Sequence, residues 1–413
     1  MFQKHNLKKI ALLALLSASF AACKKDAPDP DDHDHDDHGK EFKYVRVLVA
    51  DENSTKITQI DPAAGALSSF DGKFPLASLY ATASGRYAAV LYGANNLVEV
   101  FDTGLQSHED HVDVANNPKW AAITASGIRP THFKSDGAES LIFNDGEGTL
   151  SVASEADFNT PGARFSTINA GLTPHHGAMA QFTNGTYAVT KSAAAGASPT
   201  RVIVISKSGA QVHASTLETG AIHGNATDGS NAVFGAFTNS SNTAGGALVV
   251  RQTGEQRLIP NPDGFGAFRL GTILYAKAAK KFIGYAANKG AYLIDLVNNR
   301  MSAIYTGTDA IQCKTDYAGR NLLVLTLDGK LRIYDLATGT LKKEGQAITA
   351  TPAADTYKPV LEATGRFAYV AVPSTGEVHQ INLENFETTK HKVSARPVRL
   401  AVLGFESSES HDH

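Results

Sequence analysis

The sequence predicts an all-β protein, a β-propeller of eight four-stranded blades, with seven blades as the alternative. Three observations support this prediction. A strand–turn–strand pattern occurs eight times, its copies are spaced by about 39 to 52 residues, and one further strand-like segment remains near the C-terminus. This spacing matches the length of a propeller blade.

The clearest copy of the pattern is Gly319–Gly339, GRNLLVLTLDGKLRIYDLATG. Asn321–Thr326 is an apolar run rich in Leu and Val, and the alternating apolar residues after Gly329 are typical of a second, half-buried strand. We expect Asp328 and Gly329 to form a type I′ turn between these strands. A single hairpin cannot bury both of its faces, so the copies must pack against one another.

The other copies are more degenerate but keep the order of apolar strand, turn and apolar strand. They begin at Tyr44, Tyr87, Glu139, Thr186, Asn231, Phe282 and Phe367. Each unit can be filled out to four strands. An inner strand precedes the hairpin, as in Thr131–Asp136, and an outer strand follows it, as in Arg300–Thr306.

The first unit lacks a convincing inner strand, because a polar segment precedes Phe42. The C-terminal part of the chain carries a spare strand, Pro397–Gly404. If this strand pairs beside Tyr44–Ala50, the ring closes by joining its two ends and no sheet edge is left exposed. We therefore expect the propeller to span residues 42–405, followed by a disordered tail over 406–413.

The composition agrees with one large globular domain. The chain has 413 residues, 42% of them hydrophobic, and is long enough to bury a sizeable core. Its formal net charge is -3, which suggests neither a nucleic-acid-binding protein nor a basic membrane-surface protein. We expect a monomer without a nucleic-acid partner.

The first residues have the three parts of an export signal. A basic start with Lys4, Lys8 and Lys9 precedes an apolar run from Ile10, and small residues end the segment. The apolar run is too short to span a bilayer. We expect residues 1–22 to be a signal peptide and the mature protein to lie in the cell envelope of a Gram-negative bacterium.

The segment Ser19–Cys23, SFAAC, resembles a bacterial lipobox, with Phe20 where an aliphatic residue is usual. We expect lipid attachment at Cys23, which makes the protein a periplasmic or surface-exposed lipoprotein that contacts the membrane only through its lipid. The alternative is an ordinary signal peptide, cleaved near Ala22, with a chance cysteine. Only Cys313 then remains, so no intramolecular disulfide is possible.

Residues 23–41 have no large apolar side chain and are predicted to form a disordered, lipid-anchored tether. Histidines and aspartates alternate in it: His33, His35 and His38 stand among Asp31, Asp32, Asp34, Asp36 and Asp37. Imidazole and carboxylate groups together suit zinc, and a flexible strand of them could capture an ion weakly and release it. The alternative is a solvated acidic spacer.

Six of the nine histidines between His108 and His391 fall in four short clusters of the second to fifth units. The clusters are His108 with Asp110 and His111, then His132, then His175 with His176, and then His223. The last three each lie at the start of an inner strand, which in a propeller faces the mouth of the central channel. Residues distant in sequence converge there, as a metal site of three or four ligands requires. Glu109 or Asp110 could orient a ligand imidazole.

Strand geometry limits this prediction. Adjacent side chains point to opposite faces of a regular strand, so only one of His175 and His176 would bind the metal unless the strand begins after them. His108 and His111 could converge only in a turn or bulge. Each histidine alone is better explained as a structural residue, but their shared placement favours a zinc site. Three histidines on predicted middle or outer strands are expected to be structural: His213, His379 and His391.

An ordered set of motifs resembles the AztD family of periplasmic zinc metallochaperones. The motifs are the His/Asp-rich N-terminal segment, SHEDHVDV at Ser107, PTHF at Pro130, FNDGEG at Phe143, PHHG at Pro174 and IHGNA at Ile222. The resemblance implies a β-propeller that binds Zn²⁺ and delivers it to the solute-binding protein of a zinc ABC importer, without an enzymatic activity. The chain departs from the family pattern at Thr219, where the family has a cysteine, and in its lipoprotein-type signal.

Two other functions remain open. A metal-dependent propeller lactonase or lyase would use the same histidines, with Glu147 or Glu109 as acid, and would need an open coordination position and a roomy pocket. A protein-interaction propeller would hold no metal. The sequence contains no G-x-S-x-G elbow, phosphate-binding glycine loop or paired-cysteine motif. As a lone cysteine, Cys313 is expected to be a small buried residue.

Overall fold

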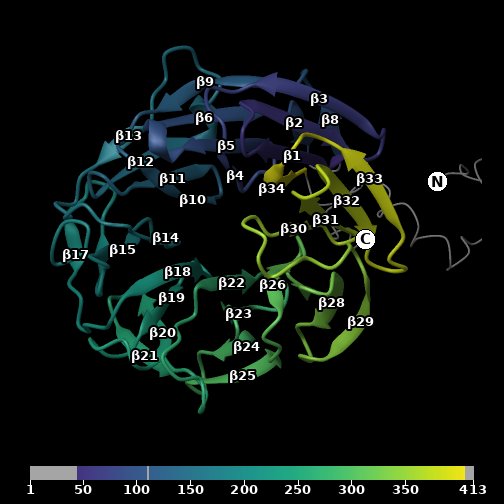
Figure 1. Ribbon diagram of the computed structural model, residues 1–413. Helices are drawn as coiled ribbons and strands as arrows, with labels where there is room; N and C mark the ends of the chain where they lie inside the picture. Colours follow the sequence, from purple (N-terminus) through teal and green to yellow (C-terminus); the bar gives the residue numbers. More distant parts are fainter. Residues whose placement is uncertain (1–43, 109–110, 405–413) are drawn as a thin grey trace, which may run out of the picture. The chain divides into compact units, whose positions relative to one another are not determined.

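The computed structural model describes residues 44–108 and 111–404 of the chain. Its strands form eight four-stranded antiparallel sheets arranged as a ring, and each sheet has one inner strand next to the axis (Figure 1). The prediction of an eight-bladed β-propeller is therefore confirmed. The predicted signal peptide, tether and C-terminal tail lie outside the described residues.

Blade one joins the two ends of the described chain. It contains β34 (Pro397–Leu403), β1 (Arg46–Asp51), β2 (Lys56–Asp61) and β3 (Ala66–Asp71). The inner strand β34 pairs antiparallel with β1, with Val402 opposite Val47. Closure by the spare C-terminal strand, as the sequence predicts, gives β1 a partner on each side.

Blade two carries an insertion that the repeat pattern does not predict. Its four strands are β4 (Ser78–Ala81), β5 (Tyr87–Tyr92), β6 (Leu97–Asp102) and β9 (Lys119–Ala125). Between β6 and β9 the chain forms a separate hairpin of β7 (Leu105–His108) and β8 (His111–Val114). The SHEDHVDV motif thus belongs to this hairpin and not to the blade itself.

Blades three to eight each use four consecutive strands in the order inner, second, third and outer. Blades three to five are β10 (Pro130–Asp136), β11 (Glu139–Asn144), β12 (Thr149–Ser154), β13 (Ser166–Ile168); β14 (Met179–Gln181), β15 (Tyr187–Lys191), β16 (Arg201–Ile205), β17 (Gln211–His213); and β18 (Ile222–Thr227), β19 (Asn231–Phe237), β20 (Gly245–Arg251), β21 (Gln256–Pro260). Blades six to eight are β22 (Thr272–Ala276), β23 (Lys281–Ala286), β24 (Gly290–Asp295), β25 (Arg300–Tyr305); β26 (Ala310–Thr315), β27 (Asn321–Thr326), β28 (Lys330–Asp335), β29 (Leu341–Gln346); and β30 (Val360–Ala363), β31 (Phe367–Val372), β32 (Glu377–Asn382), β33 (Thr388–Lys392).

Two short 3-10 helices, η1 (Gly93–Asn95) and η2 (Glu155–Asp157), lie in loops. Within the part of the chain that the structure describes, no helix is long and apolar enough to cross a lipid bilayer.

The core lies between neighbouring blades. The second strand of blade seven, β27, buries five of its six residues, whereas the outer strand β29 is almost wholly exposed. Leu323 and Ile333 of blade seven share one apolar cluster with Leu361 and Val370 of blade eight. Each blade therefore depends on its neighbours to cover its faces, as the apolar second strands indicate.

The turn in Gly319–Gly339 differs from its prediction. Leu327, Asp328 and Gly329 join β27 to β28, and among them only Gly329 has a positive φ, of 82°. A type I′ turn needs two residues with positive φ. Instead the Asp328 carboxylate accepts hydrogen bonds from Thr326 Oγ1 and from the Lys330 N–H, which holds Asp328 in an ordinary conformation and leaves the left-handed position to glycine.

Candidate metal centre

Three consecutive blades each bring one histidine to the same end of their inner strands. His132 lies in β10, His223 lies in β18, and His176 lies in the loop that precedes β14. The pairing of β10 shifts register between Pro130 and His132, and the pairing of β18 shifts between His223 and Asn225. Such bulges bend a strand and redirect its side chains, so they set the direction of both imidazoles.

Gly224 is the residue that permits the bulge in β18. Its φ is +70°, and a Cβ atom placed on it would lie 2.4 Å from the carbonyl oxygen of Gly271. A residue with a side chain would meet both a strained backbone conformation and a steric clash at this position. The glycine of the IHGNA motif is therefore required for the placement of His223.

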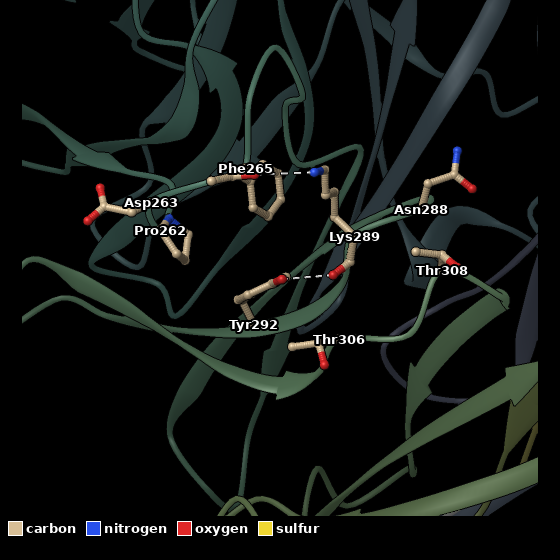
Figure 2. A pocket seen from close by; sticks show the side chains of 9 residues that line it. Pro262, Asp263, Phe265, Asn288, Lys289, Tyr292, Thr306 and Thr308 are labelled. Carbon is tan, nitrogen blue, oxygen red and sulfur yellow. Dashed lines mark hydrogen bonds between the residues drawn. The ribbon is translucent and has the colours of Figure 1, made fainter.

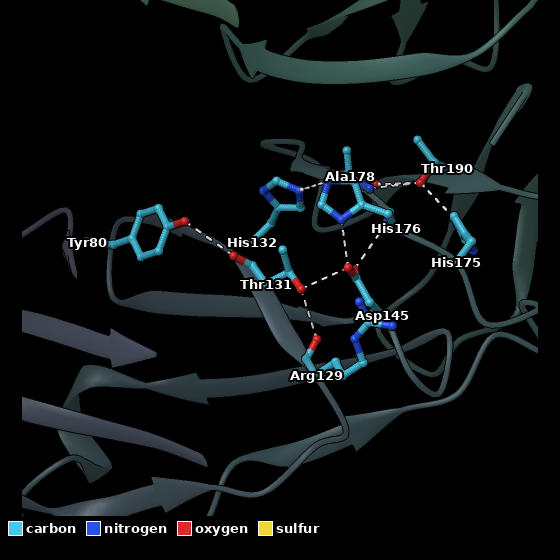
Figure 3. Close-up of polar contacts among 10 residues, drawn as sticks. Tyr80, Arg129, Thr131, His132, Asp145, His175, His176, Ala178 and Thr190 are labelled. Carbon is cyan, nitrogen blue, oxygen red and sulfur yellow. Dashed lines mark hydrogen bonds and ion pairs between the residues drawn. The ribbon is translucent and has the colours of Figure 1, made fainter. Parts of the chain in front are cut away.

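The three imidazoles form a compact cluster, which we call the histidine cluster: His132, His176 and His223. One ring nitrogen from each residue lies within 4.8 Å of the other two. The Nε2 atoms of His132 and His176 are 3.3 Å apart, and Figure 3 marks this contact with a dashed line. The ring centroids are separated by 4.8 Å, 5.4 Å and 6.1 Å for the three pairs. The cluster has the size and the donor type of a metal site.

Hydrogen bonds to Nδ1, the ring nitrogen that faces away from the cluster, orient the imidazoles of His176 and His223. His176 Nδ1 lies 2.7 Å from Asp145 Oδ2, and His223 Nδ1 lies 3.0 Å from the carbonyl oxygen of Gly271 (Figure 3 for His176). A carboxylate and a carbonyl can only accept, so each Nδ1 carries the proton and each Nε2 keeps a free lone pair. This is the tautomer that a metal-binding histidine needs.

Asp145 is itself firmly held. Its side chain is only 4% exposed, and it also accepts hydrogen bonds from Thr131 Oγ1 at 2.8 Å and from the Gly177 N–H at 3.2 Å. Burial alone would raise the pKa of Asp145, but the hydrogen bonds from His176, Thr131 and Gly177 outweigh it and hold the pKa below its ordinary value. Asp145 is therefore an ionised, fixed acceptor for His176 at neutral pH.

The surroundings keep two of the imidazoles neutral. Burial is the main cause that lowers the pKa of His132 to about 4. The neighbouring His176 and His223 contribute to the decrease, and the negative charge of Asp145 opposes it. Burial also lowers the pKa of His223, although the hydrogen bond to Gly271 opposes this. Neutral imidazole is the form that binds a metal ion, so protons compete weakly for these ligands near pH 7.

His175 lies outside the histidine cluster. Its Nδ1 lies 2.6 Å from the Thr173 carbonyl oxygen and its Nε2 lies 3.0 Å from Thr190 Oγ1, so both ring nitrogens are engaged. Figure 3 shows the contact with Thr190. The side chain is buried and packs against the Phe143 ring. The strand begins only at Met179, after both histidines, so strand alternation does not decide between them. Their different hydrogen-bond partners turn the two rings apart, and His176 is the one that joins the cluster.

The remaining candidate ligands are placed as follows. His108 and His111 pair with each other through their backbones at the end of the β7–β8 hairpin, and their side chains are not described. Asp110 and Glu109 lie outside the described residues, as do His33, His35, His38 and Cys23. These predictions remain untested. The three histidines expected to be structural lie on the third or outer strands β17, β32 and β33: His213, His379 and His391.

Cys313 is 2% exposed in β26, and burial raises the pKa of its thiol to about 12. It is thus a small buried residue, as the sequence indicates.

Sequence reasoning missed Asp145. Its FNDGEG motif contributes to the family resemblance, but the acids that the sequence predicts as partners for a ligand imidazole are Glu109 and Asp110. The order of strands in a blade is the feature of the sequence that could have identified Asp145. The turn between the second and third strands of a blade lies at the same end as the start of the inner strands, so the acid after β11 can reach the histidine that precedes β14.

A cavity of about 240 Å³ lies among the loops of blades five to seven (Figure 2). Its lining is Pro262, Asp263, Gly264, Phe265, Asn288, Lys289, Tyr292, Thr306 and Thr308. The Lys289 ammonium group lies over the Phe265 ring, and the Tyr292 hydroxyl donates to the Lys289 carbonyl oxygen. None of the three clustered histidines lines this cavity, so it is not the substrate pocket that a metal-dependent enzyme would place beside its ion.

Fold and cluster together define the class of this protein: a closed eight-bladed β-propeller with three imidazoles gathered at one end of its inner strands. It has the fold of AztD from Citrobacter koseri. One AztD structure matches with a TM-score of 0.77 and 21% sequence identity, over 87% of this chain and 98% of that chain. The structure of apo AztD matches with a TM-score of 0.77 and 20% sequence identity, over the same shares of the two chains.

Dihydro-heme d1 dehydrogenase NirN is a more distant match, with a TM-score of 0.62 and 14% identity over 87% of this chain and 75% of that one. No family model and no curated protein sequence matches the chain. At these identities the likeness shows a common fold. It agrees with the resemblance to the AztD family that the motifs indicate.

Proposed function

We propose that this protein is a zinc carrier or zinc store of the cell envelope, which holds Zn²⁺ at the histidine cluster and delivers it to the solute-binding protein of a zinc ABC importer. The observation that carries the proposal is the convergence of three ring nitrogens within 4.8 Å of one another from three blades. The AztD fold and the ordered motifs support the same assignment.

The chemistry of the cluster suits a transported ion. Zinc favours four ligands, and three imidazoles leave one position for a further donor. His176 has a side chain that is 50% exposed, whereas its partner Asp145 is buried. A receiving protein can therefore reach one ligand of the ion from solvent, while the buried carboxylate keeps that ligand oriented. This favours a cargo site over a sealed structural site.

The test of this proposal uses the metal-free protein and its zinc-loaded form. We expect elemental analysis to find one tightly bound zinc per chain after loading and dialysis. When the loaded protein is mixed with a metal-free solute-binding protein of a zinc ABC importer and the two are separated, the zinc should be found on the solute-binding protein. Transfer should be faster than zinc loss to a small chelator at the same concentration.

If zinc passed to the solute-binding protein no faster than it is lost to the chelator, the result would contradict direct delivery. Storage of zinc would then be the remaining function of the cluster. Turnover of a lactone or a polysaccharide substrate by the zinc-loaded protein would favour the enzyme alternative. A protein that takes up no zinc at all would favour a metal-free interaction propeller.

Asp145→Asn should lower the zinc affinity about 10- to 100-fold, because the outer partner of a ligand histidine fixes its tautomer and its orientation. Competition with a chromogenic chelator measures this. Asp335→Asn makes the same charge change at an exposed turn in blade seven, where Asp335 accepts hydrogen bonds from the N–H groups of Ala337 and Thr338, and should leave the affinity unchanged. Equal affinity in the Asp145 variant would mean that this carboxylate does not act on a metal ligand.

The location of the protein forms part of the proposal. Export by residues 1–22 and a lipid on Cys23 would hold the propeller at a membrane through the tether of residues 23–41. Cys23→Ala should therefore move the protein from the membrane fraction to the soluble fraction of the cell envelope, which immunoblotting of separated fractions measures. An unchanged membrane fraction would contradict lipidation.

A further inference from the structure

We propose that the cavity among the loops of blades five to seven binds a small carboxylic acid that also carries a hydroxyl or an amino group. The ammonium group of Lys289 pairs with the carboxylate of this ligand, and polar side chains of the cavity wall bind its second polar group. The site is separate from the histidine cluster and does not depend on the proposed zinc function.

The cavity is preformed, because contacts within the protein fix two of the loops that line it. In the loop between β21 and β22, Asn261 Nδ2 donates a hydrogen bond to the Phe268 carbonyl oxygen at 2.9 Å, and Phe265 is buried in the core. At the turn between β23 and β24, the Tyr292 hydroxyl donates to the Lys289 carbonyl oxygen at 2.8 Å (Figure 2). A ligand therefore does not have to order these walls, which lowers the entropic cost of binding.

Two aromatic rings hold the Lys289 ammonium group at the cavity. Its Nζ lies 5.7 Å from the centre of the Phe265 ring and 4.9 Å from the centre of the Phe268 ring, which is the range of cation–π contacts (Figure 2 for Phe265). In the described part of the chain, Nζ makes one hydrogen bond, and this bond is long, 3.4 Å to the Gly264 carbonyl oxygen. Because an ammonium group has three N–H donors, donors remain for a ligand.

The charges that line the cavity favour a carboxylate ligand. Among the residues that the structure describes, Lys289 forms no ion pair, although Asp263 lines the same cavity. A carboxylate would form charge-assisted hydrogen bonds with the Lys289 ammonium group. A phosphate group carries up to about two negative charges, which one lysine beside an aspartate would balance poorly. The ligand therefore carries one carboxylate.

Four polar side chains of the cavity wall are available to a second group of the ligand. They are Asp263, Asn288, Thr306 and Thr308. Within residues 44–108 and 111–404, no hydrogen bond to the protein engages any of these four side chains. Other loop residues are used within the protein, such as Asp295, whose carboxylate accepts hydrogen bonds from two N–H groups of its own turn. Hydroxyl, amide and carboxylate groups together suit a ligand with a hydroxyl or an amino group.

The size of the cavity limits the ligand to a small molecule. Its volume of about 240 Å³ is below the range of about 300 to 1,000 Å³ that is typical of sites for drug-sized molecules. Phe265 and Tyr292 are buried, and their ring centres are 5.3 Å apart, so they close the cavity on the side of the core. Compact acids such as lactate or serine belong to the expected class, whereas nucleotides and polysaccharides do not.

The test uses the full-length protein, metal-free in the presence of a chelator and at constant ionic strength. L-lactate and L-serine are titrated separately, with isothermal titration calorimetry and thermal unfolding as readouts. We expect one saturable site per chain for at least one of these acids, with a rise in Tm that follows its occupancy. The matching amide, lactamide or serinamide, should bind at least about tenfold more weakly, because it lacks the charge that pairs with the ammonium group.

Variants assign the binding to the cavity. Lys289→Met keeps an apolar side chain on the aromatic rings but removes the charge, and should weaken binding of the acid about tenfold or more. Lys277→Met is the matched control, because Lys277 is exposed in the turn between β22 and β23, at the opposite end of blade six. The double change Thr306→Val and Thr308→Val should reduce the preference for the acid over acetate, which has no second polar group.

Equal binding of the acid by the Lys289→Met and Lys277→Met proteins would overturn the proposal. Absence of saturable binding of both acids would do the same. The comparison of each acid with its amide uses the parent protein and therefore holds even if a variant fails to fold, and equal affinities in that comparison would also overturn the proposal. Each of these results leaves the zinc proposal intact, since no zinc is present.

Discussion

His132→Ala, His176→Ala and His223→Ala are each expected to lower tight zinc binding by more than about 100-fold, which exceeds the effect of losing an outer partner such as Asp145. Each change removes one of three nitrogens that lie within 4.8 Å of one another and leaves only two donors for an ion that favours four ligands. Chelator competition on the purified, metal-free variants measures the change.

Two control variants make this result specific. His175 is adjacent to His176 in sequence, but both its ring nitrogens are bonded to Thr173 and Thr190, so His175→Gln should keep most of the zinc affinity. His213→Ala, on the outer strand β17, should keep all of it. Circular dichroism and thermal unfolding of each variant separate loss of the site from loss of the fold.

Deletion of residues 31–38 distinguishes the cluster from the tether. We expect the deletion to change the rate of zinc loading or transfer and to leave the tight site occupied, because flexible histidines and aspartates bind an ion weakly. If the three single variants retained full zinc and the deletion abolished it, the tight site would lie in residues 31–38 and the proposed cluster site would be wrong.

Truncation before Pro397 is expected to unfold the propeller or make it aggregate. The truncation removes β34, which supplies the inner strand of blade one and buries apolar side chains, among them Val398, Leu400, Val402 and Leu403. At about 1.5 to 3 kcal/mol for each buried side chain, the loss is about 6 to 12 kcal/mol. This is comparable with the whole stability of a typical domain, about 5 to 15 kcal/mol.

The exposed edge adds to this effect, because β1 would lose the partner along its full length and present an unpaired apolar strand. The matched control ends the chain after Gly404, which keeps β34 and should leave solubility and Tm close to those of the parent. Thermal unfolding and the soluble fraction after expression measure both proteins. A chain truncated before Pro397 that remained as soluble and as heat-stable as the parent would contradict closure by β34.

The architecture could be predicted because it depends on local sequence patterns, namely apolar strands, turns and the spacing of their repeats. The apolar run Asn321–Thr326 and its degenerate copies determine where strands form, and their spacing determines that four strands make one blade. The surplus strand Pro397–Gly404 could be assigned to the first unit because a ring cannot tolerate an open edge. The β7–β8 hairpin was not predicted, because an insertion between two strands of one blade keeps the order of the repeats and has no periodicity of its own.

The candidate site was predictable only in outline. Chain order and strand position indicate that His132, His223 and one of His175 and His176 lie at equivalent places in consecutive blades. The choice of His176, the contact of its Nδ1 with Asp145, and the turn of the His223 side chain by the bulge at Gly224 depend on contacts between blades. Sequence thus determined the repeating units and the end of the ring where the histidines gather. The tertiary structure decided which imidazoles meet, because side-chain direction at a bulge or in a loop is set by packing against the next blade and not by strand periodicity.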